Sequence, residues 1–122
     1  MAKDCFVVRP GNALAGEATV PGDKSISHRA VMFGALANGV TRVHKWLPAG
    51  DTEASLGAVK ALGVPVEREG AGELVIHGGE LKPPAGVLDL VNAGTGIRLL
   101  TGIMVGQPFP SVLDGSGQLR RR

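Results

Sequence analysis

Two short segments combine glycine, a hydroxyl side chain and an arginine in the same order. Residues 21–29 read Pro-Gly-Asp-Lys-Ser-Ile-Ser-His-Arg, and residues 92–98 read Asn-Ala-Gly-Thr-Gly-Ile-Arg. In both segments the final arginine follows a hydroxyl residue by about one helical turn. Glycine lets a ligand approach the backbone closely, a hydroxyl can donate to a phosphate oxygen, and a guanidinium can clamp phosphate or carboxylate with two parallel bonds. This combination predicts binding of small anions.

Both segments also carry the signals of a helix start, where backbone N–H groups lack partners and the macrodipole is positive. Asp23 or Ser25 can cap the first helix, and apolar residues from Ile26 to Ala37 recur at helical spacing. Such helix starts are suited to bind anions. The alternative is that the polar residues are ordinary caps and both arginines face solvent. Neither segment matches the glycine-rich patterns of nucleotide-binding loops.

Other groups that could carry chemistry give weaker signals. His28, His44 and His77 lack metal-ligand spacing, so we predict no metal site. Of the three, His28 is the one that could face a ligand, since it lies in the first turns of its helix. Asp51 is predicted to be the N-cap of the second helix rather than an acid catalyst. The single cysteine, Cys5, suits a reducing compartment, and we expect a cytoplasmic location.

The elements that must position these residues alternate between strands and helices. The predicted order is β-β-α-β-α-β-β-β-α-β, which indicates an α/β fold in which a sheet of mixed direction carries packed helices. The three helices begin near residues 23, 51 and 92. The predicted strands are Cys5–Arg9, Glu17–Val20, Val40–Leu47, Val64–Glu69, Glu73–His77, Val87–Val91 and Val112–Leu113.

Composition excludes several classes of function. No apolar run approaches the length of about 20 residues that a membrane span needs, so we expect no membrane association. The segment Met1–Cys5 is too polar and short for a signal peptide. The net charge of +2 depends on Arg120–Arg122, and aromatic residues make up only 3% of the chain. We therefore expect no nucleic-acid partner.

The anion-binding motifs also resemble those of a known family. Residues 21–30 closely resemble the first signature of the 5-enolpyruvylshikimate-3-phosphate synthases, and residues 92–98 resemble the second. Residues 114–122 resemble the loop in which this family places a ligand-binding arginine. The resemblance implies a two-lobed fold, each lobe built from three βαβαββ units. Residues 1–21 would then form strands that pack in the second lobe, and residues 22–122 would form the first part of the amino-terminal lobe.

The resemblance implies transfer of the enolpyruvyl group of phosphoenolpyruvate to the 5-hydroxyl of shikimate 3-phosphate, with release of phosphate. This step belongs to the shikimate pathway of aromatic amino acid biosynthesis and requires no metal or organic cofactor. The inhibitor glyphosate occupies the phosphoenolpyruvate site in this family. By position, Lys24 is the catalytic contact to both substrates; Ser25 and Arg29 hold shikimate 3-phosphate; Asn92, Gly94, Thr95 and Arg122 surround phosphoenolpyruvate.

The sequence departs from the family in two respects. It is several times shorter, so we expect it to need a missing carboxyl-terminal portion, to have negligible turnover alone and to associate through uncovered apolar surface. Leu99 occupies a position where some members have proline, which leaves glyphosate sensitivity open. Two alternatives are a non-catalytic anion-binding module and half of a split enzyme completed by a partner chain.

Overall fold

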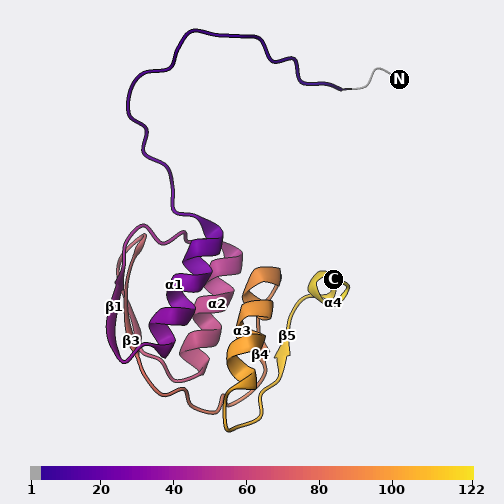
Figure 1. Cartoon of the computed structure of the whole chain (residues 1–122). Helices are drawn as coiled ribbons and strands as arrows, with labels where there is room; N and C mark the ends of the chain where they lie inside the picture. Colours follow the sequence, from indigo (N-terminus) through magenta and orange to yellow (C-terminus); the bar gives the residue numbers. More distant parts are fainter. Residues whose placement is uncertain (1–3) are drawn as a thin grey trace.

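The computed structural model describes residues 4–122, and Figure 1 shows its helices side by side against a small sheet. The predicted α/β class and all three predicted helices are confirmed, and a short fourth helix ends the chain. In chain order the elements are α1 (Lys24–Leu36), β1 (Gly39–Val43), α2 (Gly50–Ala61), β2 (Val66–Gly70), β3 (Glu73–Gly78), β4 (Leu88–Asp89), α3 (Gly94–Val105), β5 (Leu113–Asp114) and α4 (Gly117–Arg120).

The strands form two small sheets, one antiparallel and one parallel, where the sequence predicts a sheet of mixed direction. Strands β1, β3 and β2 form an antiparallel sheet in that order, with Val40 opposite His77 and Glu67 opposite Val75. The predicted hairpin between β2 and β3 is confirmed. Strands β4 and β5 pair in parallel, and this pairing holds the chain that leads into α3 beside the chain that leads into α4.

The helices pack on the antiparallel sheet and on each other. Helix α1 lies against β3, α2 lies against α1, and α3 contacts both helices. Gly34 allows the close approach of α1 to the sheet, because a Cβ there would lie 2.9 Å from Cδ1 of Ile76. The resulting core is mainly aliphatic, and Trp46 is also buried in it. Its largest fully buried aliphatic members are Leu56, Leu62, Leu74, Ile76, Leu88, Leu90, Leu100, Val31 and Val59.

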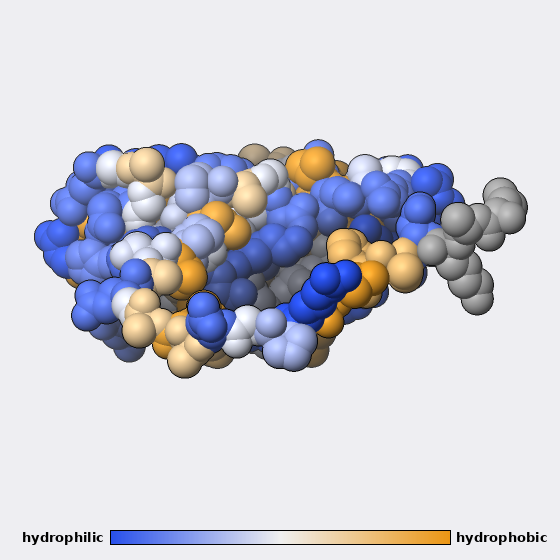
Figure 2. Space-filling model, turned by 90° about the horizontal axis from the view of Figure 1, so that it is seen from above, coloured by the Kyte–Doolittle hydropathy of each residue, from blue (hydrophilic) through white to orange (hydrophobic). Residues whose placement is uncertain are grey.

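Helices α1, α2 and α3 all begin at the same end of the molecule, which is also the end where α4 lies (Figure 1). Each strand or loop that precedes a helix therefore returns the chain to this end. Figure 2 looks down on this end, and much of the surface is hydrophilic. The fold thus gathers the positive ends of three helix macrodipoles, together with both predicted anion-binding segments, on one polar face.

The two strands predicted near the amino end are absent. Residues 4–20 carry no strand and extend away from the body, and Phe6, Val8 and Leu14 are almost completely exposed. A strand requires a neighbour to pair its backbone N–H and C=O groups, and none of the described residues pairs with this segment. Met1–Lys3, at the start of the segment judged too polar for a signal peptide, lie outside the described residues.

Two predicted strands are shorter than expected. The strand expected over Val40–Leu47 ends at Val43, and the backbone of Lys45 is left-handed, with φ of 56°. The strand expected over Val87–Val91 is reduced to Leu88–Asp89, and Val91 also has a positive φ, of 51°. Such backbone angles are unfavourable for side chains with a Cβ and incompatible with a regular strand, so the surrounding packing imposes both turns.

The start of the second helix also differs from the prediction. Ala49, not Asp51, is the N-cap of α2, and Asp51 lies inside the first turn. Ala49 makes no side-chain cap bond, and the buried hydroxyl of Thr52 stabilises this helix start: it accepts the N–H of Ala49 at 3.0 Å and donates to the carbonyl of Leu47. This leaves the Asp51 carboxylate free to contact another element. No helix among residues 4–122 is both long and apolar enough to cross a membrane.

Candidate functional site

The start of α1 holds three of the predicted substrate contacts. Asp23 caps the helix, because its carboxylate accepts the N–H of Ile26 at 2.7 Å. On the second turn, Arg29 donates from Nη1 to the carbonyl of Ser25 at 3.1 Å and also to the Ser25 hydroxyl. The hydroxyl and the guanidinium are therefore already side by side on the surface. Their polar atoms are placed to contact one anion together.

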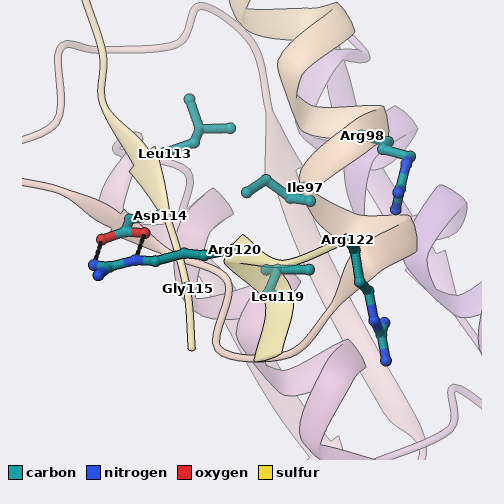
Figure 3. A pocket seen from close by; sticks show the side chains of 8 residues that line it. All are labelled: Ile97, Arg98, Leu113, Asp114, Gly115, Leu119, Arg120 and Arg122. Carbon is teal, nitrogen blue, oxygen red and sulfur yellow. Dashed lines mark hydrogen bonds and ion pairs between the residues drawn. The ribbon is translucent and has the colours of Figure 1, made fainter. Parts of the chain in front are cut away.

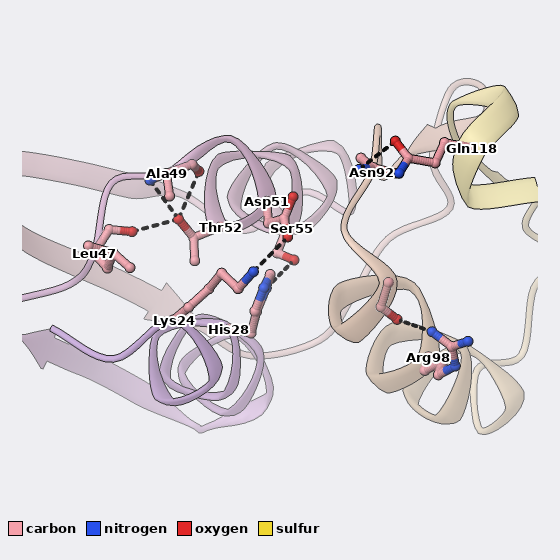
Figure 4. A network of polar contacts seen from close by, with 11 residues as sticks. Lys24, His28, Leu47, Ala49, Asp51, Thr52, Ser55, Asn92, Arg98 and Gln118 are labelled. Atoms are coloured by element: carbon pink, nitrogen blue, oxygen red, sulfur yellow. Dashed lines mark hydrogen bonds and ion pairs between the residues drawn. The ribbon is translucent and has the colours of Figure 1, made fainter. Parts of the chain in front are cut away.

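Lys24 contacts the neighbouring helix. Its Nζ lies 3.2 Å from Oδ2 of Asp51 in the first turn of α2, and Figure 4 shows this ion pair at the end where both helices begin. The lysine remains more than half exposed. An exposed ion pair contributes little to stability, so Asp51 holds the ammonium in place without preventing contact with a ligand.

The start of α3 has a different construction. Its N-cap is Ala93, which provides no side-chain hydrogen bond, so no side chain among the described residues satisfies its first N–H groups. Arg98 donates from Nη1 to the carbonyl of Gly94 at 2.9 Å, which folds the guanidinium back over the helix start. Gly94 is buried, whereas Thr95 is exposed. Open N–H groups beside a guanidinium make a suitable anion site.

A loop tied to Asn92 brings the carboxyl end of the chain to this site. Asn92 donates to Oε1 of Gln118 at 3.3 Å, and its amide oxygen accepts the Ser116 hydroxyl at 3.3 Å. Ser116 in turn caps α4 by accepting the N–H of Leu119. These bonds place α4 so that Nη1 of Arg122 would lie 3.0 Å from a Cβ on Gly94.

Arg98 and Arg122 also line a cavity of about 350 Å³ between α3, β5 and α4, which Figure 3 shows from close by. Arg120 lines the same cavity, but it forms an ion pair with Asp114 that holds the pKa of this carboxyl down at about 2. Among residues 4–122, neither Arg98 nor Arg122 forms an ion pair. The cavity therefore has two guanidinium groups whose charge is available to an anion.

A buried histidine lies between the helix starts. Nδ1 of His28 on α1 is 2.8 Å from Oγ of Ser55 on α2, and His28 is 1% exposed. Burial lowers the pKa of His28 below its ordinary value of 6.5; Lys24 and Arg29 act in the same direction, and Asp51 opposes them. The imidazole is therefore neutral at pH 7.

The structure brings the predicted residues together in two adjacent groups. Lys24, Ser25 and Arg29 form one group at the start of α1, and Gly94 and Arg122 form another with the tethered Asn92. Thr95 stands on the exposed side of α3. No local sequence pattern indicates the contacts made by Asp51, Ser55 and Gln118, since each contact depends on packing between elements. No group of metal-ligating side chains occurs in the described part of the chain.

This fold and site define a class: an α/β protein that presents cationic helix starts on one polar face. The EPSP synthase (3-phosphoshikimate 1-carboxyvinyltransferase) family model matches residues 8–122. The chain is 52% identical over 118 residues to the 3-phosphoshikimate 1-carboxyvinyltransferase of Halorhodospira halophila, and 50% identical over 120 residues to that of Acidithiobacillus ferrooxidans. It covers 27% and 28% of these two relatives, which match 94% and 96% of the chain.

A solved structure gives the same result. The EPSP synthase from Acinetobacter baumannii superimposes with a TM-score of 0.82 at 46% sequence identity, over 88% of this chain and 25% of that one. The chain therefore belongs to the EPSP synthase family, as the three motifs predicted. It spans about a quarter of the length of these relatives, and it includes both helix starts described above.

Proposed function

We propose that this chain is the amino-terminal part of an enzyme that transfers the enolpyruvyl group of phosphoenolpyruvate to the 5-hydroxyl of shikimate 3-phosphate. The observation that carries the proposal is Gly94, which lies against Arg98 and Arg122 at the uncapped start of α3. Both substrates are phosphorylated anions, and this chain offers two cationic helix starts on one face. Family membership supports the same reaction.

Each helix start has its own substrate in this proposal. Ser25 and Arg29 hold shikimate 3-phosphate, and the start of α3 holds phosphoenolpyruvate with Asn92, Thr95 and Arg122. Lys24, which belongs to the group at the start of α1, contacts both substrates in this proposal. A charge-assisted hydrogen bond contributes about 1.5–3 kcal/mol, so a few such contacts give useful affinity for each anion.

The reaction follows from this placement of two anions side by side. The 5-hydroxyl of shikimate 3-phosphate gives up its proton as its oxygen bonds to C2 of phosphoenolpyruvate, and the C2=C3 double bond becomes single as C3 gains a proton, which gives a tetrahedral adduct. The adduct then loses phosphate from C2 and a proton from C3, and the enol ether remains. The guanidinium groups and Lys24 balance the negative charge that the departing phosphate carries.

The remaining domain assignments are part of the same proposal. Residues 1–21 pack in the second lobe of the full-length enzyme, and residues 22–122 form the first part of the amino-terminal lobe. Ile26 and Phe33 on α1 and Val105 on α3 are largely exposed, and further units of the lobe would cover such apolar surface. The single cysteine suits the reducing cytoplasm, which we propose as the location.

The test is phosphate release by a full-length protein that carries this sequence, measured with both substrates and with each alone. We expect release that depends on both substrates, negligible release from the 122-residue chain and recovery when the chain is mixed with the carboxyl-terminal portion. Full-length protein that binds both anions without turnover would contradict the proposal and favour a non-catalytic anion-binding module. If the two portions are encoded as separate chains, recovery of phosphate release when they are mixed would favour a split enzyme.

A further inference from the structure

His28 is a buried polar residue that the proposed substrate contacts leave without a role. It lies one turn after Lys24 on α1, and Figure 4 shows its ring directed at Ser55 on α2. Ser55 is itself completely buried. The other ring nitrogen, Nε2, has no hydrogen-bond partner among the described residues. A buried polar atom without a partner lowers stability, so folding stability alone does not explain a histidine here.

The third helix rests on the same pair. A Cβ on Gly96 would collide with Oγ of Ser55 and would lie 3.5 Å from Cε1 of His28. Only a glycine lets the first turn of α3 come this close. The imidazole is therefore carried by α1, bonded to α2 through Ser55 and close to the first turn of α3. The three helix starts meet at one side chain.

The position of His28 distinguishes a positioning role from a catalytic one. With 1% of its surface exposed, the ring does not touch solvent or a ligand bound on the polar face. Lys24 and Arg29 lie near it on its own helix, and Asp51 faces it from α2. A neutral ring adds no charge among these groups, so it can fix the distance between helices without altering the charge of the anion sites.

We propose that His28 is a positioning residue: hydrogen-bonded to Ser55, against which Gly96 closely approaches, it sets the spacing between the anion-binding starts of α1 and α3. The proposal rests on the proposed function, because it takes these starts to hold the two reacting substrates. Each start binds its anion through its own side chains. A change in spacing therefore slows the reaction between the bound substrates more than it weakens the binding of either substrate. Displacement of reacting groups by about 1 Å can lower a rate about 100-fold.

The kinetic test uses the full-length enzyme with His28→Leu, which removes the bond to Ser55, and His28→Asn, whose amide can occupy the place of Nδ1. We expect His28→Leu to lower kcat about 10- to 100-fold with the Kd of each substrate changed less than about 3-fold. His28→Asn should keep most of the kcat. The matched control is His77→Leu on β3, which should leave both parameters unchanged. An unchanged kcat in His28→Leu, or an equal loss in kcat and binding, overturns the proposal.

A second pair of variants tests the contact with α3. Gly96→Ala should lower kcat in the same way, because its new Cβ meets Oγ of Ser55. Ser55→Ala should also lower kcat, because it removes the oxygen that the imidazole bonds. An unchanged kcat in either variant overturns the role of this contact. The pair also keeps the proposal testable if His28→Leu does not fold.

A structural measurement separates this proposal from the proposed function. Residual dipolar couplings of backbone amides in the 122-residue chain report the orientation of α1 relative to α3 without any turnover. His28→Leu should change this orientation, and His28→Asn and His77→Leu should not. The same orientation in all forms overturns the positioning role. Absence of turnover in the wild-type enzyme, by contrast, contradicts the proposed function while the orientation still decides the role of His28.

Discussion

Gly94 and Arg122 lie against each other although Gly94 begins α3 and Arg122 follows the end of α4: a Cβ on Gly94 would be 3.0 Å from Nη1 of Arg122. The same atom would lie 3.2 Å from Nη1 of Arg98. The absence of a side chain therefore lets two guanidinium groups approach the first N–H groups of α3. This relationship converts an ordinary helix start into a site with three sources of positive potential.

We predict that Gly94→Ala in the full-length enzyme weakens the binding of glyphosate more than the binding of phosphoenolpyruvate. The added methyl group displaces both guanidinium groups by a few tenths of an ångström and occupies space beside the ligand. The family resemblance implies that glyphosate would be the more crowded of the two ligands, so we expect its inhibition constant to rise at least about 10-fold more than the KM for phosphoenolpyruvate. Gly102→Ala on the same helix has open space around its new Cβ and is the control. Equal changes in the two constants would refute the steric explanation.

Arg122 is predicted to bind phosphoenolpyruvate rather than shikimate 3-phosphate. Arg122→Gln removes one charge-assisted contact of about 1.5–3 kcal/mol, which corresponds to roughly a 10- to 150-fold rise in the KM for phosphoenolpyruvate. The Kd for shikimate 3-phosphate, measured by calorimetry, should stay within about 2-fold. Arg121→Gln removes the same charge from the preceding position and should have little effect on either constant. A comparable loss in both variants would indicate a nonspecific effect of charge.

Thr52, rather than Asp51, should stabilise the start of α2. Thr52→Val keeps the shape but removes the buried hydroxyl that serves Ala49 and Leu47, so the free energy of unfolding should fall by about 1–3 kcal/mol. Asp51→Asn affects a partly exposed ion pair and should change stability by less than about 1 kcal/mol. Urea unfolding of the 122-residue chain measures both. A larger loss from Asp51→Asn would restore Asp51 as the principal cap.

His28 should make the chain less stable in acid. Its pKa is lower in the folded chain than in the unfolded chain, mainly through burial, so the unfolded chain takes up a proton first as the pH falls. The stability that the neutral ring contributes is therefore complete above about pH 6.5 and is lost as the pH falls through the folded pKa. Unfolding of wild type and His28→Asn between about pH 8 and about pH 5 should give curves that converge in acid. Parallel curves would contradict this linkage.

Local chemistry explains which parts of the fold were predictable. The apolar spacing after Asp23 and the glycine-rich start at Gly94 specify helices within a few residues, so α1 and α3 follow from the sequence alone. The hairpin of β2 and β3 likewise depends on the turn between them. The prediction of two amino-terminal strands was wrong because strand formation depends on a distant partner, whereas the residue types indicate only a tendency.

The candidate site was predictable to the extent that it consists of contiguous motifs. Lys24, Arg29 and Gly94 carry their chemistry in their own segments, and their roles as substrate contacts stay predictions. The bonds of Lys24 to Asp51 and of His28 to Ser55 join different helices, so no local pattern indicates them. The sequence predicts Asp51 as the cap because acidic residues near a helix start commonly are caps, but the helix begins one residue before Asp51, at Gly50, and Ala49 takes the N-cap position.

The common starting end of α1, α2 and α3 has an energetic consequence. Helices that run side by side in the same direction repel one another, because like ends of their peptide dipoles are neighbours. A phosphoryl group bound at that end would act as a counterion to all three helix starts and would relieve this repulsion. Binding of the proposed substrates would then also stabilise the packing of the three helices against one another.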